Sequence, residues 1–350
     1  MGPSRGETNR RYGRAARAVK LASGTMAVFA SPRGSSDPAA RSVSVLVLST
    51  SKFVEQQLAA IRAAAPSLAI HTDPASAPAD VEAIHAFMLA PGIAPRFPAL
   101  RFVASAGAGV DLILACPDLP SHLPVVRPVD PMQATRLAQY VALAVLRHAR
   151  GLPRYEAQQR ERRWARLPQP DESSFAVGLM GCGALGAPVA ATLRALGYPV
   201  AVWTRSGRAP PGTRSYAGDA ALPAFLARSH VLVCLLPLTA DTRGLVDAPA
   251  LARLPQGAHV ISVSRGGIVD EAALVAAIDA GRLSGATLDV YATEPLPDAS
   301  PLWRHPAILC TPHIAAIARP GVVAAQFLDN LARSRAGRPL VRTVDRDRGY

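Results

Sequence analysis

Apolar runs and amphipathic stretches alternate along the chain from residue 42 onward. Residues 43–48 (VSVLVL) form an uninterrupted apolar run that is typical of a buried strand, and residues 51–66 follow with helical periodicity up to a proline. Two further strands are expected at residues 85–88 and 101–105. Because strands that alternate with helices form parallel sheets, the pattern predicts an α/β fold.

A longer helix is predicted for residues 132–150. Its apolar positions recur at helical spacing, with Leu137, Val141, Ala144 and Val145 on one face. Such a helix is suited to join two domains and to bury a face against a partner subunit.

Composition supports two globular domains. The chain has 350 residues, 49% of them hydrophobic, and a mean hydropathy of +0.17. No window reaches the roughly 18 uninterrupted apolar residues of a membrane span, so we expect a soluble protein without a membrane partner. The cysteines lie far apart without C-x-x-C spacing, which favours reduced thiols, a cytoplasmic location and no metal site.

The net charge of +13 is concentrated at the start of the chain, since residues 1–41 account for six of these charges. We expect this basic extension to be disordered. Three origins are open for it: a transit peptide, a basic arm, or a start codon placed upstream of a true start at Met26, which we favour. Nucleic-acid binding through this segment is an alternative function, but the clustering of charge outside the globular part argues against nucleic acid as a partner.

Residues 175–197 (FAVGLMGCGALGAPVAATLRALG) place Gly181, Gly183 and Gly186 in G-x-G-x-x-G spacing. The motif follows an apolar strand, opens a helix and precedes a second strand at 200–203 (VAVW), which is the context of a dinucleotide site. The three glycines permit the tight turn, the approach of a pyrophosphate and the packing of helix on strand, respectively. Ala184 and Leu185 complete the predicted cofactor loop.

The residues after the second strand indicate which dinucleotide binds. An NAD site usually has a carboxylate here, whereas this chain has Thr204, Arg205, Ser206 and Arg208. Two guanidinium groups can bind a phosphate through charge-assisted hydrogen bonds, so we expect NADP(H) to be preferred and NAD(H) to be possible. The alternative is that these arginines belong to a solvated loop.

Later strands deliver further residues to the cofactor crevice, because strand carboxyl ends border it in a doubly wound sheet. Predicted cofactor contacts here are Leu236, Pro237, Thr242, Val263 and Ser264. Three successive strands then end in ionisable side chains: Arg265 within 258–274 (AHVISVSRGGIVDEAAL), Asp289 and Glu294 within 286–297 (ATLDVYATEPLP), and His313 within 308–316 (ILCTPHIAA). We expect these groups to converge on one cleft.

At this point the chain resembles the D-isomer-specific 2-hydroxyacid dehydrogenases, especially their glyoxylate and hydroxypyruvate reductase branch. The resemblance covers nearly everything after residue 42, and it is carried by SAGAGVD (105–111), the glycine motif, WTRS, SRGGIVDE, DVYATEPLP, PLWRHPAILCTPHIAA and VDRDRGY (344–350). It implies a homodimer of two-domain subunits. A Rossmann cofactor domain (133–314) would be inserted into a flavodoxin-like substrate domain (42–132 and 315–350).

The resemblance also assigns roles. Arg265 would bind the substrate carboxylate and 2-oxo oxygen, Glu294 would pair with His313, and His313 would transfer the proton. Asp289 would lie near the nicotinamide carboxamide. The backbone of Ala106, Gly107 and Ala108 would hold the carboxylate. Trp303 is a candidate for the substrate pocket or an interface, with a core anchor for the loop before the last strand as the alternative.

Elementary chemistry supports these roles, because reduction of a 2-oxo acid needs a hydride, a proton and a cation that binds the carboxylate. Arginine offers a planar fork for bidentate contact, and a neighbouring carboxylate stabilises the imidazolium form of a histidine. His313 is therefore predicted to be the general acid in reduction, against the alternative of a hydrogen-bonded core histidine.

The sequence thus predicts NADPH-dependent reduction of a small 2-oxo acid such as glyoxylate or hydroxypyruvate, because the SAGAG loop consists of small residues. A reductase of larger 2-oxo acids and a dinucleotide-sensing corepressor remain alternatives. Three positions are noted beside the family pattern: Ser262 stands where many relatives have Asn, Tyr140 favours the reductase branch, and Arg127 is a candidate for the pocket or an interface.

Overall fold

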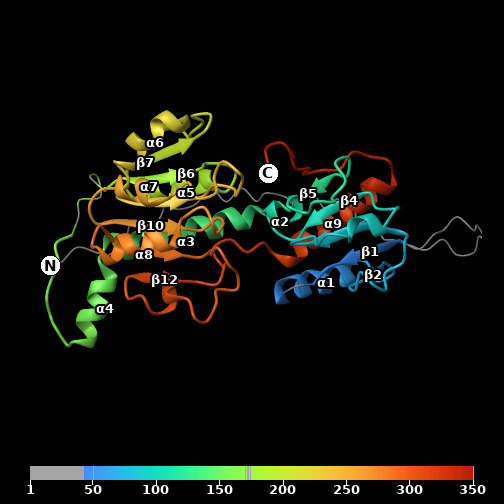
Figure 1. Ribbon diagram of the computed structural model, residues 1–350, viewed down its shortest axis with the longest axis horizontal. Helices are drawn as coiled ribbons and strands as arrows, with labels where there is room; N and C mark the ends of the chain where they lie inside the picture. Colours follow the sequence, from blue (N-terminus) through green and yellow to red (C-terminus); the bar gives the residue numbers. More distant parts are fainter. Residues whose placement is uncertain (1–42, 50, 170, 172, 174, 350) are drawn as a thin grey trace, which may run out of the picture. The chain divides into compact units, whose positions relative to one another are not determined.

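The computed structural model describes residues 43–49, 51–169, 171, 173 and 175–349. The predicted extension of residues 1–41 lies outside the described residues. The first part of the chain forms a five-stranded parallel sheet in the order β2-β1-β3-β4-β5 (Figure 1). Its strands are β1 (Ser44–Val47), β2 (Ala69–His71), β3 (Val81–Ala86), β4 (Phe102–Ser105) and β5 (Val125–Val126). This is the flavodoxin-like strand order.

Strand β3 differs from the sequence expectation, which placed a strand at residues 85–88. The strand begins at Val81, which pairs with Ser44 of β1, and ends at Ala86. The prediction followed only the most apolar residues and missed the start, because half-buried Glu82 interrupts the apolar run.

Helices from both ends of the chain cover this sheet. They are α1 (Lys52–Ala64), α2 (Asp111–Leu114), the short η1 (Ala94–Arg96) and the C-terminal α9 (Pro320–Arg335). Phe327 of α9 packs on Phe102 of β4, with ring centroids 6.0 Å apart, in a core that α1 shares. The C-terminal helix therefore returns to the first sheet, as predicted.

The second sheet has seven parallel strands in the order β12-β11-β10-β9-β6-β7-β8. The strands are β6 (Val177–Met180), β7 (Val200–Thr204), β8 (Arg214–Ala217), β9 (Val231–Cys234), β10 (Ala258–Ser262), β11 (Leu283–Leu288) and β12 (Ile308–Cys310). Strand order reverses beside β6, as in Rossmann folds. The predicted fold class, two parallel-sheet α/β domains of which one is a Rossmann domain, is confirmed.

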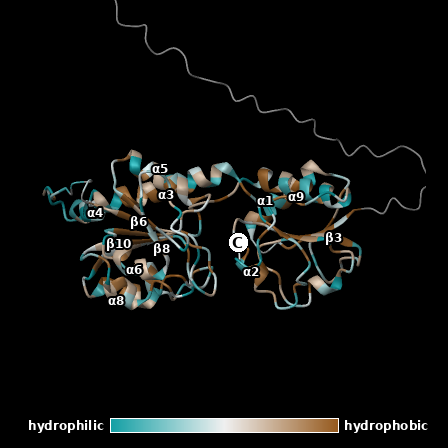
Figure 2. Ribbon diagram, turned by 90° about the horizontal axis from the view of Figure 1, so that it is seen from above, coloured by the Kyte–Doolittle hydropathy of each residue, from teal (hydrophilic) through white to brown (hydrophobic). Residues whose placement is uncertain are grey.

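The helices that accompany this sheet are α3 (Pro131–Ala149), α4 (Leu152–Arg160), α5 (Gly186–Ala195), α6 (Gly218–Leu226), α7 (Ala248–Ala252), α8 (Glu271–Asp279) and η3 (Pro301–Arg304). Strands such as β6 and β10 are buried along their whole length, and Figure 2 shows the strands in the colour of hydrophobic residues. The predicted apolar face of α3 is buried in the same core as Val189 and Leu193 of α5.

Two polar residues tie together the segments that connect the sheets. The carboxylate of Asp130, which caps α3, accepts hydrogen bonds from the Nε, Nη2 and backbone N–H of Arg319. The Arg319 bonds outweigh the cost of burial and hold the pKa of Asp130 at about 2. Within the part of the chain that the structure describes, no helix is long and apolar enough to cross a membrane.

Candidate active site

Three neighbouring strand ends bring the predicted catalytic residues to one edge of the second sheet. Strands β10, β11 and β12 lie side by side and parallel, and Arg265, Glu294 and His313 follow them in that order. The turn after Arg265 also packs against the segment before Glu294, because a Cβ on Gly266 would overlap the carbonyl of Tyr291. The three residues therefore lie at one edge of the sheet, and the cleft that they were expected to share stays a prediction.

His313 and Glu294 form a close pair. Nδ1 of His313 lies 2.7 Å from Oε2 of Glu294, and the other carboxylate oxygen accepts the backbone N–H of Tyr291 at 3.0 Å. Because the carboxylate accepts, Nδ1 carries the donated proton. Nε2 of His313 has no hydrogen-bond partner among the described residues, and the side chain is 45% exposed. This nitrogen is available to a substrate.

The charge state of Glu294 follows from its neighbours. Burial raises the pKa of this carboxyl, but the hydrogen bond and charge of His313 outweigh that effect, so the pKa lies below its usual value. The guanidinium of Arg265 lowers the same pKa further. Glu294 is therefore ionised near neutral pH and is a charged acceptor for Nδ1 of His313.

Asp289 holds the loop that carries His313. Its buried carboxylate accepts hydrogen bonds from the hydroxyl of Thr311 at 2.6 Å and from the backbone N–H groups of Ile314 and Ala315, each at 2.8 Å. His313 itself lies in the left-handed region with φ 55°, and its N–H donates to the carbonyl of Asp289 at 2.9 Å. Such a backbone conformation is unfavourable for a residue other than glycine and persists only where surrounding contacts impose it.

Tyr140 of α3 extends this network. Its hydroxyl lies 2.6 Å from that of Thr311, which in turn donates to Asp289. Burial raises the pKa of Tyr140 to about 12, so the phenol stays protonated. The predicted contact of Asp289 with the nicotinamide stays a prediction; its carboxylate in this structure is engaged in positioning the histidine loop.

Arg265 makes a contact that the sequence interpretation missed. Its Nε donates to Oδ1 of Asp111 at 2.9 Å, and its Nη1 donates to the carbonyl of Ser264 at 2.8 Å. Asp111 begins α2 and is the last residue of the SAGAGVD motif. A Cβ on Gly109 would overlap the guanidinium, so this glycine lets the arginine lie directly against the loop.

The backbone N–H groups of the loop at residues 106–109 differ in whether they have a hydrogen-bond acceptor. The N–H of Ala106 donates to Ala86 at 2.9 Å and that of Gly107 to the hydroxyl of Ser105 at 3.2 Å. The N–H groups of Ala108 and Gly109 have no acceptor among the described residues. Two adjacent free donors beside a guanidinium form a suitable site for a carboxylate.

The glycine loop has the geometry that dinucleotide binding needs. Gly181 has φ 92°, and Gly186 begins α5, where a Cβ would lie 3.1 Å from the carbonyl oxygen of Gly181. Gly183 and Ala184 are exposed, and Leu185 is the N-cap residue of α5. The loop thus leaves the amino end of a ten-residue helix accessible to a pyrophosphate.

The loop after β7 contains the predicted phosphate ligands. Arg205 is exposed and its Nη1 lies 3.5 Å from Oδ2 of Asp241. The hydroxyl of Thr204 donates to the carbonyl of Arg208, and the hydroxyl of Ser206 accepts the N–H of Arg208. The loop is therefore folded on itself, with both guanidinium groups on its outside.

The remaining residues that were predicted to contact cofactor or substrate follow strands β9 and β10 or precede β12. Leu236 and Pro237 follow β9, and the hydroxyl of Thr242 donates to the carbonyl of Pro237 at 2.6 Å, closing that loop. Val263 is buried and Ser264 half-buried at the end of β10. Trp303 is 49% exposed, so it is not the core anchor that was the alternative, and its indole N–H donates to the carbonyl of Pro297 at 3.0 Å. A role in the substrate pocket stays a prediction.

Two positions noted from the sequence also have defined places. Ser262 is buried at the end of β10, and its carbonyl accepts the N–H of Asp289 at 2.9 Å. Nη1 of Arg127 donates to the carbonyl of Ala108 at 3.4 Å, so this side chain contacts the loop at residues 106–109. Among the described residues, no group of three or more His, Cys, Asp or Glu side chains could hold a metal ion.

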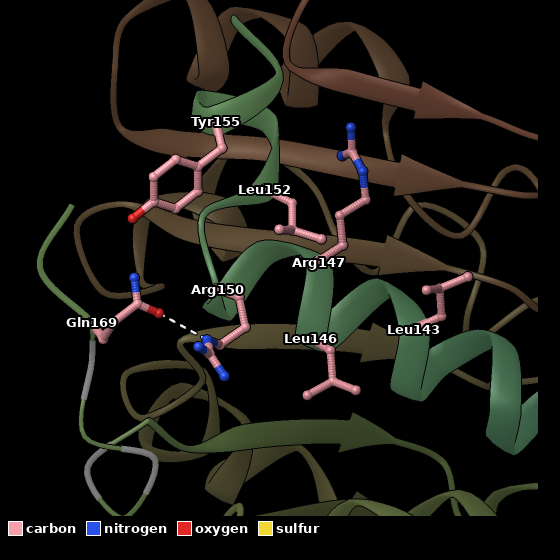
Figure 3. A pocket seen from close by; sticks show the side chains of 7 residues that line it. All are labelled: Leu143, Leu146, Arg147, Arg150, Leu152, Tyr155 and Gln169. Atoms are coloured by element: carbon pink, nitrogen blue, oxygen red, sulfur yellow. Dashed lines mark hydrogen bonds between the residues drawn. The ribbon is translucent and has the colours of Figure 1, made fainter. Parts of the chain in front are cut away.

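An apolar pocket lies elsewhere, on α3, α4 and the segment after them (Figure 3). None of its residues belongs to the strand ends described above, and one wall is closed by a hydrogen bond from Nε of Arg150 to the side chain of Gln169. The lining residues are Leu143, Leu146, Arg147, Arg150, Leu152, Tyr155 and Gln169. This pocket is a candidate interface rather than part of the active site.

Comparison with known proteins gives consistent matches. Residues 142–315 match the family model described as D-isomer specific 2-hydroxyacid dehydrogenase, NAD binding domain. A glyoxylate/hydroxypyruvate reductase A from Salmonella newport is 43% identical over 256 residues, which cover 72% of this chain and 82% of the relative.

Solved structures of similar proteins agree. A D-isomer specific 2-hydroxyacid dehydrogenase from Xanthobacter autotrophicus, in complex with NADPH and MES, is 41% identical with a TM-score of 0.80, covering 89% of this chain and 100% of that one. An NADPH-dependent glyoxylate/hydroxypyruvate reductase from Sinorhizobium meliloti, in complex with NADP and sulfate, is 37% identical with a TM-score of 0.81, covering 88% and 100%.

Proposed function

Because the chain belongs to the D-isomer specific 2-hydroxyacid dehydrogenase family, in its glyoxylate/hydroxypyruvate reductase A branch, we propose that it reduces glyoxylate or hydroxypyruvate with NADPH. It is an oxidoreductase of the 2-hydroxyacid dehydrogenase type. The observation that carries the proposed substrate chemistry is the 2.7 Å pair of His313 and Glu294 at the same sheet edge as Arg265.

The three side chains have separate roles in this reaction. NADPH supplies the hydride when it is bound. His313 donates the proton from Nε2 to the developing alkoxide, while Glu294 holds Nδ1 and stabilises the imidazolium. Arg265 binds the carboxylate and 2-oxo oxygen through the guanidinium edge that Asp111 does not occupy. The free N–H groups of the 106–109 loop complete the carboxylate site.

The residues at the cofactor crevice fit a phosphorylated dinucleotide. The accessible amino end of α5 would hold the pyrophosphate, and the exposed guanidinium groups of Arg205 and Arg208 would hold the additional phosphate of NADPH. The relatives crystallised with NADPH or NADP support this preference.

The decisive experiment follows the absorbance of NADPH during incubation with glyoxylate, hydroxypyruvate and bulkier 2-oxo acids. We expect turnover with the two small acids and a loss of at least about 10²-fold in kcat for His313→Ala, the usual value of general acid catalysis. Turnover only with bulky acids would refute the substrate, and unchanged kcat in the variant would refute the role of His313. The corepressor alternative is not favoured, because the matched relatives are named as reductases.

We also propose a homodimer that uses the α3–α4 face. Leu143 and Leu152 are 64% and 45% exposed beside the pocket of Figure 3, and burying them against a second copy would remove apolar surface from water. Leu143→Asp should shift sedimentation toward the monomer, whereas Leu196→Asp, at an exposed leucine after α5, should not. An unshifted Leu143→Asp would exclude this interface.

The domain limits and the location are proposals as well. We place the domain boundaries after residues 132 and 314. Both lie close to the Asp130–Arg319 ion pair, which joins the two segments that connect the sheets. The cysteines are all free, which supports a cytoplasmic location.

A further inference from the structure

A buried polar pair contacts the loop at residues 106–109, here called the substrate loop. Gln57 of α1 and His85 of β3 are both completely buried, beside the apolar core that α1, β3 and α9 share. Nε2 of His85 lies 2.6 Å from Oε1 of Gln57, and Nε2 of Gln57 donates to the carbonyl of Ala106 at 2.9 Å. A chain of two hydrogen bonds therefore connects the sheet to the first peptide of the loop.

The direction of these bonds is determined by the last acceptor. A carbonyl can only accept, so Gln57 must turn its NH₂ group to Ala106 and its oxygen to His85. His85 must then donate from Nε2 and is neutral; burial lowers its pKa to about 4. Rotation of the amide by half a turn would bring two oxygen acceptors together at the Ala106 end.

Two other carbonyls of the loop also accept hydrogen bonds from side chains. Nη1 of Arg127 donates to Ala108, and the hydroxyl of Ser105 donates to Gly109 at 2.7 Å. The carbonyl of Ala108 and the N–H of Gly109 belong to the same peptide group, so the bond from Arg127 also fixes the direction of this N–H. The N–H groups of Ala108 and Gly109 have no acceptor among the described residues.

Stability alone does not explain the pair. Burial of polar side chains is unfavourable unless every group is satisfied, and Nδ1 of His85 is buried without a partner in the described part of the chain. Two apolar residues of similar volume would fill the space without this cost. What the polar pair provides is a donor directed at one carbonyl of the loop.

We propose that Gln57 and His85 are positioning residues for substrate binding, which hold the loop at residues 106–109 so that its free N–H groups face the carboxylate of the 2-oxo acid. This inference rests on the proposed function. It assigns a role to residues that touch neither substrate nor cofactor, and it predicts a defect in substrate KM that does not extend to NADPH.

The test compares Gln57→Met with Asn330→Ala. Methionine fills the space without a donor, whereas Asn330 is a buried amide of the same sheet region that bonds the backbone of Val341, away from the loop. We expect Gln57→Met to raise the KM for glyoxylate about tenfold, the equivalent of one hydrogen bond of ~1.4 kcal/mol, with the KM for NADPH unchanged. Asn330→Ala should lower the unfolding temperature and leave both KM values unchanged.

His85→Phe provides a second variant. It keeps a ring beside Phe327, whose centroid is 5.2 Å from that of His85, but it releases the amide of Gln57 to rotate. The same selective rise in substrate KM is expected.

The possible failures are distinguishable. A wild type without turnover would refute the proposed function and this inference with it. An active wild type with unchanged substrate KM in both variants would refute the inference alone. Failure of both variants to fold, while Asn330→Ala folds, would assign the pair to fold stability and overturn the positioning role.

Discussion

Acidification should destabilise the protein through histidines that are neutral in the folded state. The imidazole of His148 in α3 stacks on that of His259 in β10 with ring centroids 4.5 Å apart, and Phe175 lies 5.6 Å from His148. Burial lowers the pKa of His148 from 6.5 to about 4, and it does the same for His85. Burial lowers the pKa of His259 as well, and the neighbouring His148 adds to the effect.

The sign follows from proton binding. Between the unfolded value of 6.5 and the folded value of about 4, the unfolded chain binds protons that the folded chain does not, so the free energy of unfolding falls as pH falls through this window. At about pH 5 each of His148 and His85 should lower the free energy of unfolding by about 2 kcal/mol relative to about pH 8. Asp130, with a pKa of about 2 in the folded state, loses its contribution to the free energy of unfolding only at lower pH.

The assay is urea unfolding of wild type and His148→Phe at these two pH values. Phenylalanine keeps a ring against Phe175 and His259 but cannot bind a proton, so the variant should lose about 2 kcal/mol less than wild type on acidification. His122→Phe, at an exposed histidine, is the control and should match wild type. An equal loss of stability in His148→Phe and wild type would refute the reasoning.

Three predictions concern the active site. Glu294→Gln should lower kcat by about tenfold, because Nδ1 of His313 loses its charged acceptor; steady-state kinetics test this, and an unchanged kcat contradicts the pairing. Arg265→Lys should lower kcat/KM for glyoxylate by about 10²-fold, since one ammonium cannot serve both Asp111 and the substrate, and steady-state kinetics with wild-type values would exclude that role. Arg205→Ala should raise the KM for NADPH about tenfold and leave that for NADH unchanged; equal KM values for both cofactors in both proteins would rule out phosphate recognition.

Much of the fold could be predicted because its signals are local. The glycine motif lies within one strand, one turn and one helix, and the structure has β6, the loop and α5 where these were expected. The end of α3 follows in the same way from helical periodicity, whereas the return of α9 to the first sheet was expected only from the family resemblance. Strand β3 was misplaced because a central strand with one half-buried acidic residue has no clear period.

The site was predictable to the extent that strand ends determine it. Arg265, Glu294 and His313 each lie in the loop that follows one of three neighbouring strands, so sheet order brings them together. Asp111 was missed because its bond to Arg265 joins residues 154 positions apart in two different sheet regions. No local pattern records such a pairing.

Gln57 was missed although the sequence carried a signal for it. The buried face of α1 consists of Val54, Gln57, Leu58 and Ile61, so the glutamine occupies a position where helical spacing requires an apolar residue. A polar side chain on an apolar helix face must find a partner in the core. That requirement points to a buried acceptor, and in this fold the acceptor belongs to the substrate loop.

The small residues of the substrate loop have a cause other than the size of the substrate. A Cβ on Gly107 would lie 2.6 Å from the ring of Phe87, and a Cβ on Gly109 would overlap the guanidinium of Arg265. Both glycines are therefore required by the protein's own packing. Gly109→Ala would displace Arg265 from Asp111, so its effect on catalysis would come through carboxylate binding rather than through the width of the pocket.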